Sequence, residues 1–419
     1  MLDEAIGGET PVTGVGAPIP ATIDLARAAA TRWDALVAGA GPAGALSALL
    51  LARDGVSTLL VDRRDFPRHK VCGCCVNDRA VAHLERLGLV DELRALGGRP
   101  LGAIRLLHER RVAELPLPGG LAVSRAALDG VLVRAAIAAG ADFLPATAAS
   151  LAGPRTLVAS DASSTHDDRR PVRLLHRDGG RADALASVVI AADGLGHSSL
   201  PEDPGFQSRV SPSARIGVGG LAPRAVVVST PGTITMAIGE RGYVGVVEVE
   251  GGGSIVAAAL DAEHMRDSGG PAATVAAILV EAGARVEIAA LRQVDWTGTI
   301  ALTRHLLRPV GERIFVVGDA AGYVEPFTGE GIAWALVSAH EVVPFVRRGL
   351  SGWSTTLEQD WLAARRARID SQQRWCRALA TLLRHPPAVR AAIAALQLRP
   401  GLARPVLSRV VGRRVNARS

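Results

Sequence analysis

The chain has 419 residues, of which 48% are hydrophobic and 21% are charged, a globular balance that excludes a disordered protein and favours roughly two or three domains. The formal net charge is +6, but arginines are spread along the chain and aromatic residues make up only 3%. A nucleic-acid binder would need clustered charge and stacking aromatics, so no nucleic-acid partner is expected.

The N-terminal part is expected to form a flexible extension followed by a β-α-β unit. Residues 1–31 are polar at first and lack the apolar segment of a secretory signal, which predicts a cytoplasmic protein. An apolar strand is predicted over 33–38, a helix over 42–53 and a second strand over 57–61. Glycines near the start of the apolar stretch 35–52 indicate a strand, a tight turn and a buried helix rather than a membrane span.

A glycine motif lies between the first strand and the first helix. Gly39 permits the turn, Gly41 lets a pyrophosphate approach the backbone, and Gly44 allows the helix to pack closely on the strand. Pro42 and Ala43 open the helix, whose free N–H groups would face the phosphates. Asp62, at the end of the second strand, is placed to accept ribose hydroxyls. Together these features predict a dinucleotide site.

The segment after the second strand contains Lys70, the only lysine, and three cysteines, Cys72, Cys74 and Cys75. Two interpretations of the cysteines are open: small buried residues on a tight loop, or thiols with a chemical role. A third interpretation, zinc ligation, is weaker because no second pair of ligands is spaced for a tetrahedral site. No metal is therefore expected.

Further along the chain, helices are predicted over 77–87 and 124–139, the second capped by Ser124. The polar segment 159–173 is expected to be a surface loop, and the apolar run 188–192 a buried strand that ends at Asp193. Glycine-separated β-rich runs at 225–229, 233–237, 243–249 and 254–259 predict an antiparallel sheet.

The late part repeats the pattern of a strand followed by ligand-binding residues. A strand over 314–317 delivers Gly318 and Asp319, where open α/β sheets bind ligands. A helix over about 329–348 then begins at a glycine turn whose N–H groups can stabilise negative charge on a bound ring. Glu325 and Glu330 on this turn are candidate acids, although carboxylates on such loops are usually solvated. Residues 355–419 are expected to be helical, broken by prolines.

The order of these motifs resembles the p-hydroxybenzoate hydroxylase fold of FAD-dependent oxidoreductases, over about residues 33 to 350. The Lys70-Val71-Cys72-Gly73 segment is similar to that of the geranylgeranyl reductase-like branch. The resemblance implies an α/β fold: a Rossmann-like FAD-binding domain, an antiparallel β-sheet substrate domain and a C-terminal helical region. The expected ranges are 1–31 for the extension, 32–210 and 301–350 for the FAD-binding domain, 211–300 for the substrate domain and 351–419 for the helical region.

The resemblance also assigns roles to individual residues. Cys72 would lie beside the flavin and the substrate and is the candidate catalytic residue. Arg125 matches an arginine at the start of a helix close to the cofactor. The full set of candidate FAD-binding residues is Gly39, Gly41, Pro42, Ala43, Gly44, Asp62, Arg63, Lys70, Arg125, Asp193, Gly318, Asp319, Pro326, Gly329, Gly331 and Ile332.

The activity implied by the resemblance is hydride transfer involving a carbon–carbon double bond of a hydrophobic small molecule, isoprenoid- or polyketide-like. The alternatives are an NAD(P)H-dependent flavin monooxygenase of an aromatic or polyketide product and a non-enzymatic flavin electron carrier. No second glycine motif follows a strand, so NAD(P)H is expected as a transiently docked electron donor. The basic tail 398–414 is either a helical cap or a peripheral contact to an anionic membrane. The sequence leaves the oligomeric state unknown.

Overall fold

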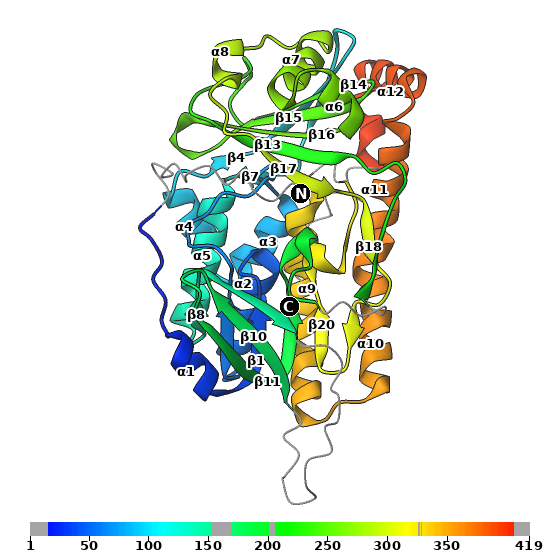
Figure 1. The fold of residues 1–419 in the computed structure, drawn as a ribbon. Helices are drawn as coiled ribbons and strands as arrows, with labels where there is room; N and C mark the ends of the chain where they lie inside the picture. Colours follow the sequence, from blue (N-terminus) through cyan, green and yellow to red (C-terminus); the bar gives the residue numbers. More distant parts are fainter. Residues whose placement is uncertain (1–15, 152–168, 201–205, 326, 328, 406–419) are drawn as a thin grey trace, which may run out of the picture.

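The computed structural model describes residues 16–151, 169–200, 206–325, 327 and 329–405, which form two layers joined by helices (Figure 1). The lower layer is built on an eight-stranded sheet in the order β19-β20-β11-β1-β2-β8, extended by β10 and β9. Its strands are β1 (Arg32–Ala38), β2 (Thr58–Val61), β8 (Asp142–Leu144), β9 (Thr147–Leu151), β10 (Arg170–His176), β11 (Arg181–Ala191), β19 (Val310–Gly311) and β20 (Ile314–Val316). β20, β11, β1, β2 and β8 run parallel, so their carboxyl ends meet at one edge.

Three apolar helices cover one face of this sheet: α2 (Pro42–Arg53), α5 (Arg125–Ala138) and α9 (Glu330–Ser351). Ser124 caps α5 through a hydrogen bond from the Ala127 N–H to its Oγ (3.1 Å), as its sequence predicts. The predicted β-α-β unit is confirmed, because β1 and β2 pair in parallel and α2 connects them.

The segment before β1 packs against the same domain. α1 (Leu25–Ala30) lies against β11, Ile19 and Ile23 are buried, and the Ile19 N–H donates to the Phe66 carbonyl (2.9 Å). The expectation of a flexible extension is therefore wrong for residues 16–31, because their apolar side chains complete the core. Residues 1–15 lie outside the described part of the chain.

The second layer is a seven-stranded sheet in the order β17-β13-β16-β15-β14-β5-β6. Its strands are β5 (Ala103–His108), β6 (Arg111–Pro116), β13 (Ile216–Ala222), β14 (Thr233–Gly239), β15 (Gly242–Glu248), β16 (Ser254–Leu260) and β17 (Thr297–Ala301). The outer face is covered by α6 (Ala262–Asp267), α7 (Pro271–Glu281) and α8 (Ile288–Leu291), as Figure 1 shows. β5 joins this sheet by parallel pairing with β14, although it lies within the range expected for the FAD-binding domain.

Two expected segments differ from the structure. Residues 225–229 form no strand, and Val227 makes only an isolated bridge to Val286. Residues 170–173, expected in a surface loop, belong to β10, because Val172 and Leu174 alternate into the core while Arg173 and Leu175 face outward. The remainder of that expected loop, 159–168, lies outside the described residues.

Short elements connect the two layers. They are β3 (Cys75–Asn77), α3 (Asp78–Arg86), α4 (Val90–Ala95), β4 (Arg99–Pro100), β7 (Gly120–Ala122), β12 (Ser208–Val210), β18 (Arg304–Leu306) and β21 (Gly322–Tyr323). Strands β3, β7 and β4 pair with one another just below the second sheet.

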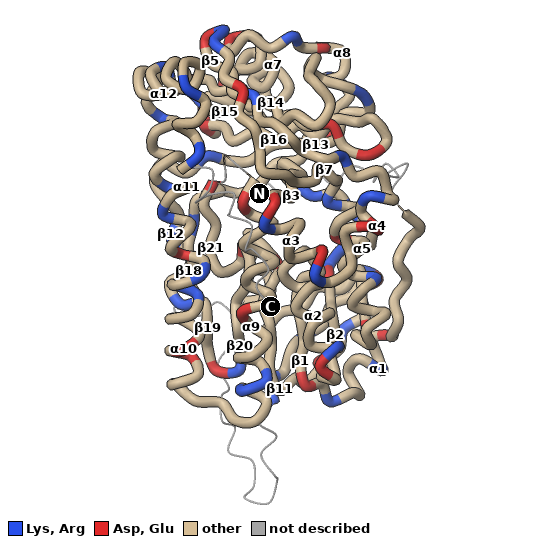
Figure 2. Tube along the Cα trace, turned by 180° about the vertical axis from the view of Figure 1, so that it is seen from behind, with Lys and Arg blue, Asp and Glu red and all other residues tan. Residues whose placement is uncertain are grey.

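The C-terminal helices run alongside both layers. α10 (Thr355–Arg365) packs on α9 and passes through a π-helical turn (Arg366–Asp370) into α11 (Ser371–Leu382), and α12 (Pro386–Leu398) lies against β5 and β6. The helical expectation is confirmed for the described part of this region. None of the described helices is both long enough and apolar enough to span a membrane. Figure 2 shows basic and acidic residues interspersed over both layers.

Candidate functional site

The glycine loop between β1 and α2 is closed so tightly that two of its positions tolerate only glycine. Gly39 has a φ of +103°, and a Cβ there would lie 2.5 Å from the Ala192 carbonyl oxygen. A Cβ on Gly44 would lie 1.8 Å from the Gly39 carbonyl oxygen, so the helix can approach the loop only without a side chain at that position. These contacts fix the start of α2 at the carboxyl edge of the sheet.

Gly41 differs from these two glycines because it faces side chains rather than backbone. A Cβ on Gly41 would lie 3.4 Å from an Nη2 atom of Arg125 and 3.7 Å from the Nη2 of Arg68. Two guanidinium groups therefore converge in front of the first turn of α2, where free N–H groups and the positive end of the helix dipole also point. This set of donors fits a pyrophosphate group.

Two carboxylates hold these guanidinium groups in place. Arg125 donates two hydrogen bonds to the fully buried Asp129, at 2.9 and 2.8 Å. Arg68 donates to Asp62 at 3.2 Å and lies 3.5 Å from Asp129. Neither Arg68 nor Asp129 was among the residues selected from the sequence. The spacing of Arg125 and Asp129, four residues apart on one helix, could have indicated the pair.

Asp62 lies where the sequence places it, at the carboxyl end of β2, but its carboxylate also organises the loop. Its Oδ2 accepts from the Ala40 N–H at 2.8 Å, and its Oδ1 accepts from the Arg64 N–H at 3.0 Å. The neighbouring Arg63 has an exposed side chain, and its contact with the cofactor stays a prediction.

Two predicted site residues, Lys70 and Asp319, and the unpredicted Tyr323 form a chain of neighbours in which Asp319 is close enough to interact electrostatically with both of the others. Lys70 is exposed to solvent, yet the protein surrounds it closely enough that desolvation lowers its pKa, with a further contribution from Arg125. Asp319 and Tyr323 are only partly buried, and desolvation raises the pKa of both. An accessible group that is strongly desolvated has protein on several sides, and we use the name cleft for the region that Lys70, Asp319 and Tyr323 share.

Cys72 lies in the same cleft and has the character of a thiolate. A hydrogen bond from the Cys74 side chain lowers the pKa of Cys72 to about 6, against the opposing effect of desolvation, and the positive charge of Arg125 lowers it further. The Cys74 N–H also donates to the Cys72 Sγ at 3.3 Å. The pKa of Cys74 is raised well above its usual range by its hydrogen bond to Cys72, and burial raises that of Cys75 to about 12. Cys72 is thus the reactive thiol of the three.

The late motif packs directly on the early one. A Cβ on Gly318, whose φ is +59°, would lie 2.8 Å from the Cβ of Ala43, and the Gly318 N–H donates to the Ser338 Oγ on α9 at 3.0 Å. Asp319 therefore lies beside the start of α2, within electrostatic range of Lys70 and Arg125. The structure thus unites two motifs that lie far apart in the sequence.

The glycine turn before α9 lies against the cysteine loop. Gly329, the N-cap of α9, has a φ of +77°, and a Cβ there would lie 3.2 Å from the Cβ of Cys75. Gly331 faces the ring of Tyr323, and Ile332 is buried in the core. Pro326 lies outside the described residues.

Asp193 holds the turn that follows β11. Its Oδ2 accepts from the Ser199 N–H at 2.8 Å and from the Ser198 Oγ at 3.1 Å. Its Oδ1 is buried without a hydrogen-bond partner among the described residues, and the backbone of Asp193 lies directly behind Gly39. This acceptor is compatible with the contact to the cofactor that the sequence predicts.

The two glutamates of the late turn are structural, which corrects the expectation that they are solvated. Both are 1% exposed. Glu325 accepts from the Arg215 Nη1 at 3.2 Å and lies 3.7 Å from an Nη2 of Arg384, and Glu330 lies 3.6 Å from an Nη2 of Arg79 and accepts from Asn77 at 3.2 Å. Their partners come from distant segments, so the local sequence gives no signal of the burial.

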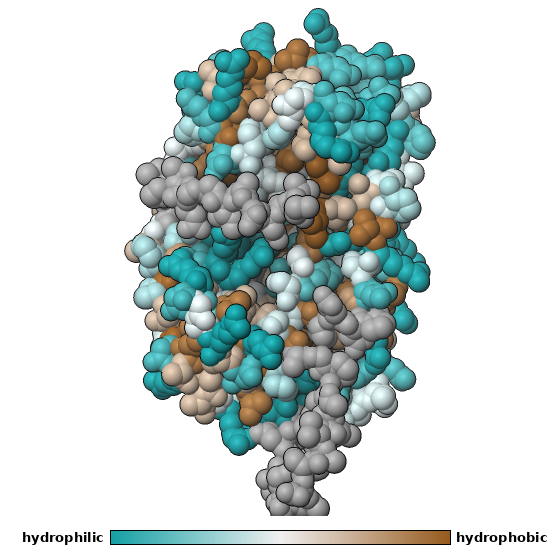
Figure 3. All heavy atoms as spheres, viewed as in Figure 1, coloured by the Kyte–Doolittle hydropathy of each residue, from teal (hydrophilic) through white to brown (hydrophobic). Residues whose placement is uncertain are grey.

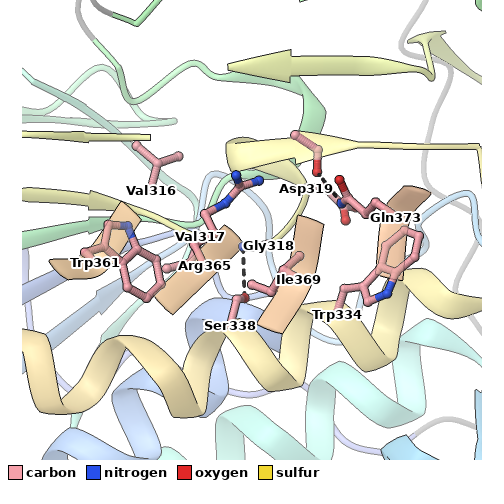
Figure 4. A pocket seen from close by; sticks show the side chains of 11 residues that line it. Val316, Val317, Gly318, Asp319, Trp334, Ser338, Trp361, Arg365, Ile369 and Gln373 are labelled. Atoms are coloured by element: carbon pink, nitrogen blue, oxygen red, sulfur yellow. Dashed lines mark hydrogen bonds between the residues drawn. The ribbon is translucent and has the colours of Figure 1, made fainter. Parts of the chain in front are cut away.

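A cavity behind the late turn lies between α9 and the C-terminal helices (Figure 4). It has a volume of about 10 Å³, room for one water molecule, and Ser338, Trp361 and Gln373 are among its lining residues. Arg365 donates to the Ala321 carbonyl at 3.0 Å, which ties α10 to the turn. The cavity is too small for a dinucleotide. The side chains around it pack the turn against the C-terminal helices.

The zinc interpretation gains no support from the part of the chain that the structure describes. No group of three or more His, Cys, Asp and Glu side chains there is arranged to hold a metal ion.

Comparisons with known proteins agree with this geometry. The sequence model of the FAD binding domain matches residues 32–369. The chain is 27% identical to a menaquinone reductase of Mycolicibacterium smegmatis, over 79% of this chain and 81% of the relative. It is also 27% identical to digeranylgeranylglycerophospholipid reductase 2 of Methanothermobacter thermautotrophicus, over 72% of this chain and 74% of the relative.

Solved structures show the same fold at low sequence identity. A flavoprotein/dehydrogenase from Cytophaga hutchinsonii superposes with a TM-score of 0.72 at 18% identity, over 91% of this chain and 93% of that one. A probable FAD-dependent monooxygenase from Pseudomonas aeruginosa superposes with a TM-score of 0.63 at 18% identity, over 87% of this chain and the whole of that one. These similarities establish the p-hydroxybenzoate hydroxylase type of fold predicted from the sequence.

The open space at Gly41 leads to a first prediction. Gly41→Ala should leave the fold intact, because the new methyl group lies at ordinary van der Waals distance from the arginine side chains, but should weaken FAD binding about tenfold or more by occupying the position of the pyrophosphate. Flavin absorbance per protein and thermal unfolding of the apoprotein measure the two effects. Gly102→Ala is the control, since a Cβ there meets no atom within 4 Å. Equal flavin content in the two variants would contradict the assignment.

A second prediction concerns the thiolate. Alkylation of Cys72 by iodoacetamide should rise with pH around a midpoint near 6, because the thiolate forms above its pKa. Cys74→Ala removes the main stabilising hydrogen bond and should move the midpoint upward. Cys75→Ala is the matched control and should leave it in place. A midpoint between 8 and 9 in the unsubstituted protein would show that Cys72 is an ordinary thiol.

Proposed function

Because the chain belongs to the FAD binding domain family, we propose that this protein transfers a hydride to a carbon–carbon double bond of a hydrophobic, isoprenoid-like molecule. Family membership makes it an FAD-dependent oxidoreductase. The choice of reaction and substrate within that class is the proposal. Two similar relatives are named as reductases, one of menaquinone and one of digeranylgeranylglycerophospholipid. Both compounds carry isoprenoid chains with carbon–carbon double bonds.

The observation that carries the proposal is an apolar cluster that joins the second sheet to the cysteine loop. The sheet contributes its inner face, and the loop contributes Cys74 and Cys75, with the half-buried Cys72 and Tyr323 packed at the edge of the cluster. The cluster members from the sheet and the C-terminal helices include Ile104, Leu106, Ile234, Met236, Ile238, Leu383, Val389 and Ile393. The buried members of this cluster pack against one another, and the apolar wall that they form beside the cysteine loop suits a hydrophobic ligand.

The surface near the junction of the two layers is also apolar in places. Figure 3 shows hydrophobic atoms gathered just below the second sheet on the face that it displays. Ile300 on β17 and Val210 on β12 are among the exposed hydrophobic residues of the described chain. A hydrophobic substrate would find its first contacts there.

Different residues of the cleft are proposed to bind the cofactor, orient the substrate and transfer protons. FAD, when bound, supplies the hydride chemistry. The N–H groups at the start of α2, with Arg68 and Arg125, bind its pyrophosphate, and the apolar sheet face orients the substrate and excludes water. The low pKa of Cys72 favours a thiolate near neutral pH and desolvation raises the pKa of Tyr323, which makes the two side chains the candidate proton acceptor and proton donor of the cleft.

NAD(P)H is the proposed source of electrons and would dock transiently. The reason is the sequence itself, which has one dinucleotide-binding glycine motif, at Gly39 to Gly44, and no second one after a strand.

The reaction is tested by the mass of the product. The holoprotein, given NADPH and a geranylgeranyl lipid, should yield a product heavier by two hydrogen atoms. Cys72→Ser should keep its flavin but lose at least about tenfold in turnover. A product heavier by one oxygen atom would replace the proposal with a monooxygenase, and oxidation of NADPH without any product would favour an electron carrier.

A peripheral membrane contact through the C-terminal helices is a separate proposal. Arginines without any acidic residue occur over residues 371–405. At the end of α12, Leu398 is 85% exposed and Leu402 is 55% exposed, next to Arg399 and Arg404. Exposed leucines flanked by arginines suit the surface of an anionic bilayer, from which a lipid-soluble substrate would be collected.

Flotation with phosphatidylglycerol vesicles tests this contact. The protein should float with anionic vesicles and not with phosphatidylcholine vesicles. Leu398→Asp combined with Leu402→Asp should reduce the floated fraction severalfold, because the substitutions remove the apolar contact and add negative charge. Val280→Asp on α7, an exposed site on a different helix of the second layer, is the matched control. Equal flotation of all variants, or none, would refute the contact.

A further inference from the structure

The cysteine loop contains more thiols than the proposed reaction uses. Among the described residues the four cysteines are all free, and three of them lie within residues 72–75. Cys74 adopts a left-handed backbone conformation, with a φ of +52°, that only a tight turn requires. This turn brings Cys74 back onto Cys72.

The turn closes through hydrogen bonds from Cys74 onto the Cys72 sulfur atom. The Cys74 N–H donates to the Cys72 Sγ at 3.3 Å, and the two side chains also hydrogen-bond to each other. Cys72 is half-buried and faces the cleft, whereas Cys74 is 1% exposed. The accessible sulfur atom of Cys72 thus lies next to the buried Cys74. In thiol pairs of this kind the accessible thiol forms a mixed disulfide with a small disulfide, and the second thiol then displaces the small thiol.

We propose that Cys72 and Cys74 form a reversible disulfide by exchange with a small disulfide of the glutathione class. The Cys72 thiolate attacks one sulfur of the small disulfide, forms a mixed disulfide and releases one small thiolate. Cys74 then loses its proton and attacks the Cys72 sulfur, which releases a second small thiolate. The pair gives up two electrons, which reduce the small disulfide to one thiol, which takes the proton of Cys74, and one thiolate.

The other two cysteines are placed to stay out of this exchange. The Cys75 Sγ donates to the Gly73 carbonyl at 3.1 Å, and burial raises its pKa to about 12. Cys376 is buried on α11, near Glu330 and Arg79, and its pKa is also raised to about 12 by burial. Both remain protonated at neutral pH and are poor nucleophiles. They provide matched controls within the same chain.

Oxidation of the pair would change the charge of the cleft. The reduced loop places a thiolate close enough to Arg125 and Tyr323 to affect the pKa of both. The disulfide is neutral, so Arg125 would keep Asp129 as its anionic partner and lose Cys72. This consequence rests on the proposed function, since it makes the disulfide an off-switch for a reductase that needs the Cys72 thiolate. The formation of the disulfide rests on the loop geometry alone.

The test uses the yellow holoprotein with Cys75→Ser and Cys376→Ser, which leaves only the proposed pair. Treatment with glutathione disulfide at pH 7, followed by trypsin without reductant, releases residues 71–79 as one peptide. We expect this peptide to lose two hydrogen atoms in mass and to regain them with dithiothreitol. With Cys74→Ser added, the peptide should instead carry a stable glutathione adduct on Cys72.

Each outcome decides between the alternatives. A peptide that stays reduced, or one that ends as a glutathione adduct while Cys74 is present, overturns the proposal. Flavin absorbance is measured on the same samples. Absence of flavin would undermine the proposed function and leave the disulfide result valid, whereas failure of the disulfide in a yellow protein would count against the redox pair alone.

Discussion

The site depends on the convergence of three cations in front of the first turn of α2. Arg68 and Arg125 face Gly41, and Lys70 is close enough for both to lower its pKa. Like charges at such distances repel one another, and the N-terminus of a helix adds to the positive potential. Asp62 and Asp129 offset part of this potential, but both also hold a guanidinium group in place. The arrangement is therefore completed by an anion, and a pyrophosphate supplies two negative charges to the helix terminus.

The C-terminal helices belong to the site as much as the glycine loop does. Glu330 opens α9 and is paired with Arg79 on α3, and the same arginine donates a hydrogen bond to Gln372 on α11. Breaking one member of such a buried pair costs more than the pair contributes, because the remaining charge is left without compensation. The network therefore keeps the glycine turn, α3 and α11 in register. The apolar cluster above them, which α11 and α12 complete, depends on the same register.

Local patterns in the sequence predicted the parts of the structure that are made locally. The turn at Gly39, the cap at Ser124 and the position of Asp62 follow from neighbours a few residues away. Pairing between distant segments left no such pattern, so β5 was not assigned to the second sheet that it joins through β14. The burial of Glu325 was not predicted for the same reason. Its partners lie far away in the sequence: Arg215 directly precedes β13, and Arg384 follows the end of α11. A carboxylate on a glycine turn looks solvated until its partners are known.

Arg125 links the anion site to the thiol chemistry. Its guanidinium group is held by Asp129, faces Gly41 and contributes to the low pKa of Cys72. A pyrophosphate bound at α2 would share the positive charge of Arg125 and so weaken its stabilisation of the thiolate. The hydrogen bond from Cys74 is the larger contribution to the low pKa and does not depend on Arg125. The loop thus keeps Cys72 reactive when the cofactor is bound. Cys74 lowers the pKa of Cys72 in the reduced loop, and in the proposed disulfide it would remove the thiolate.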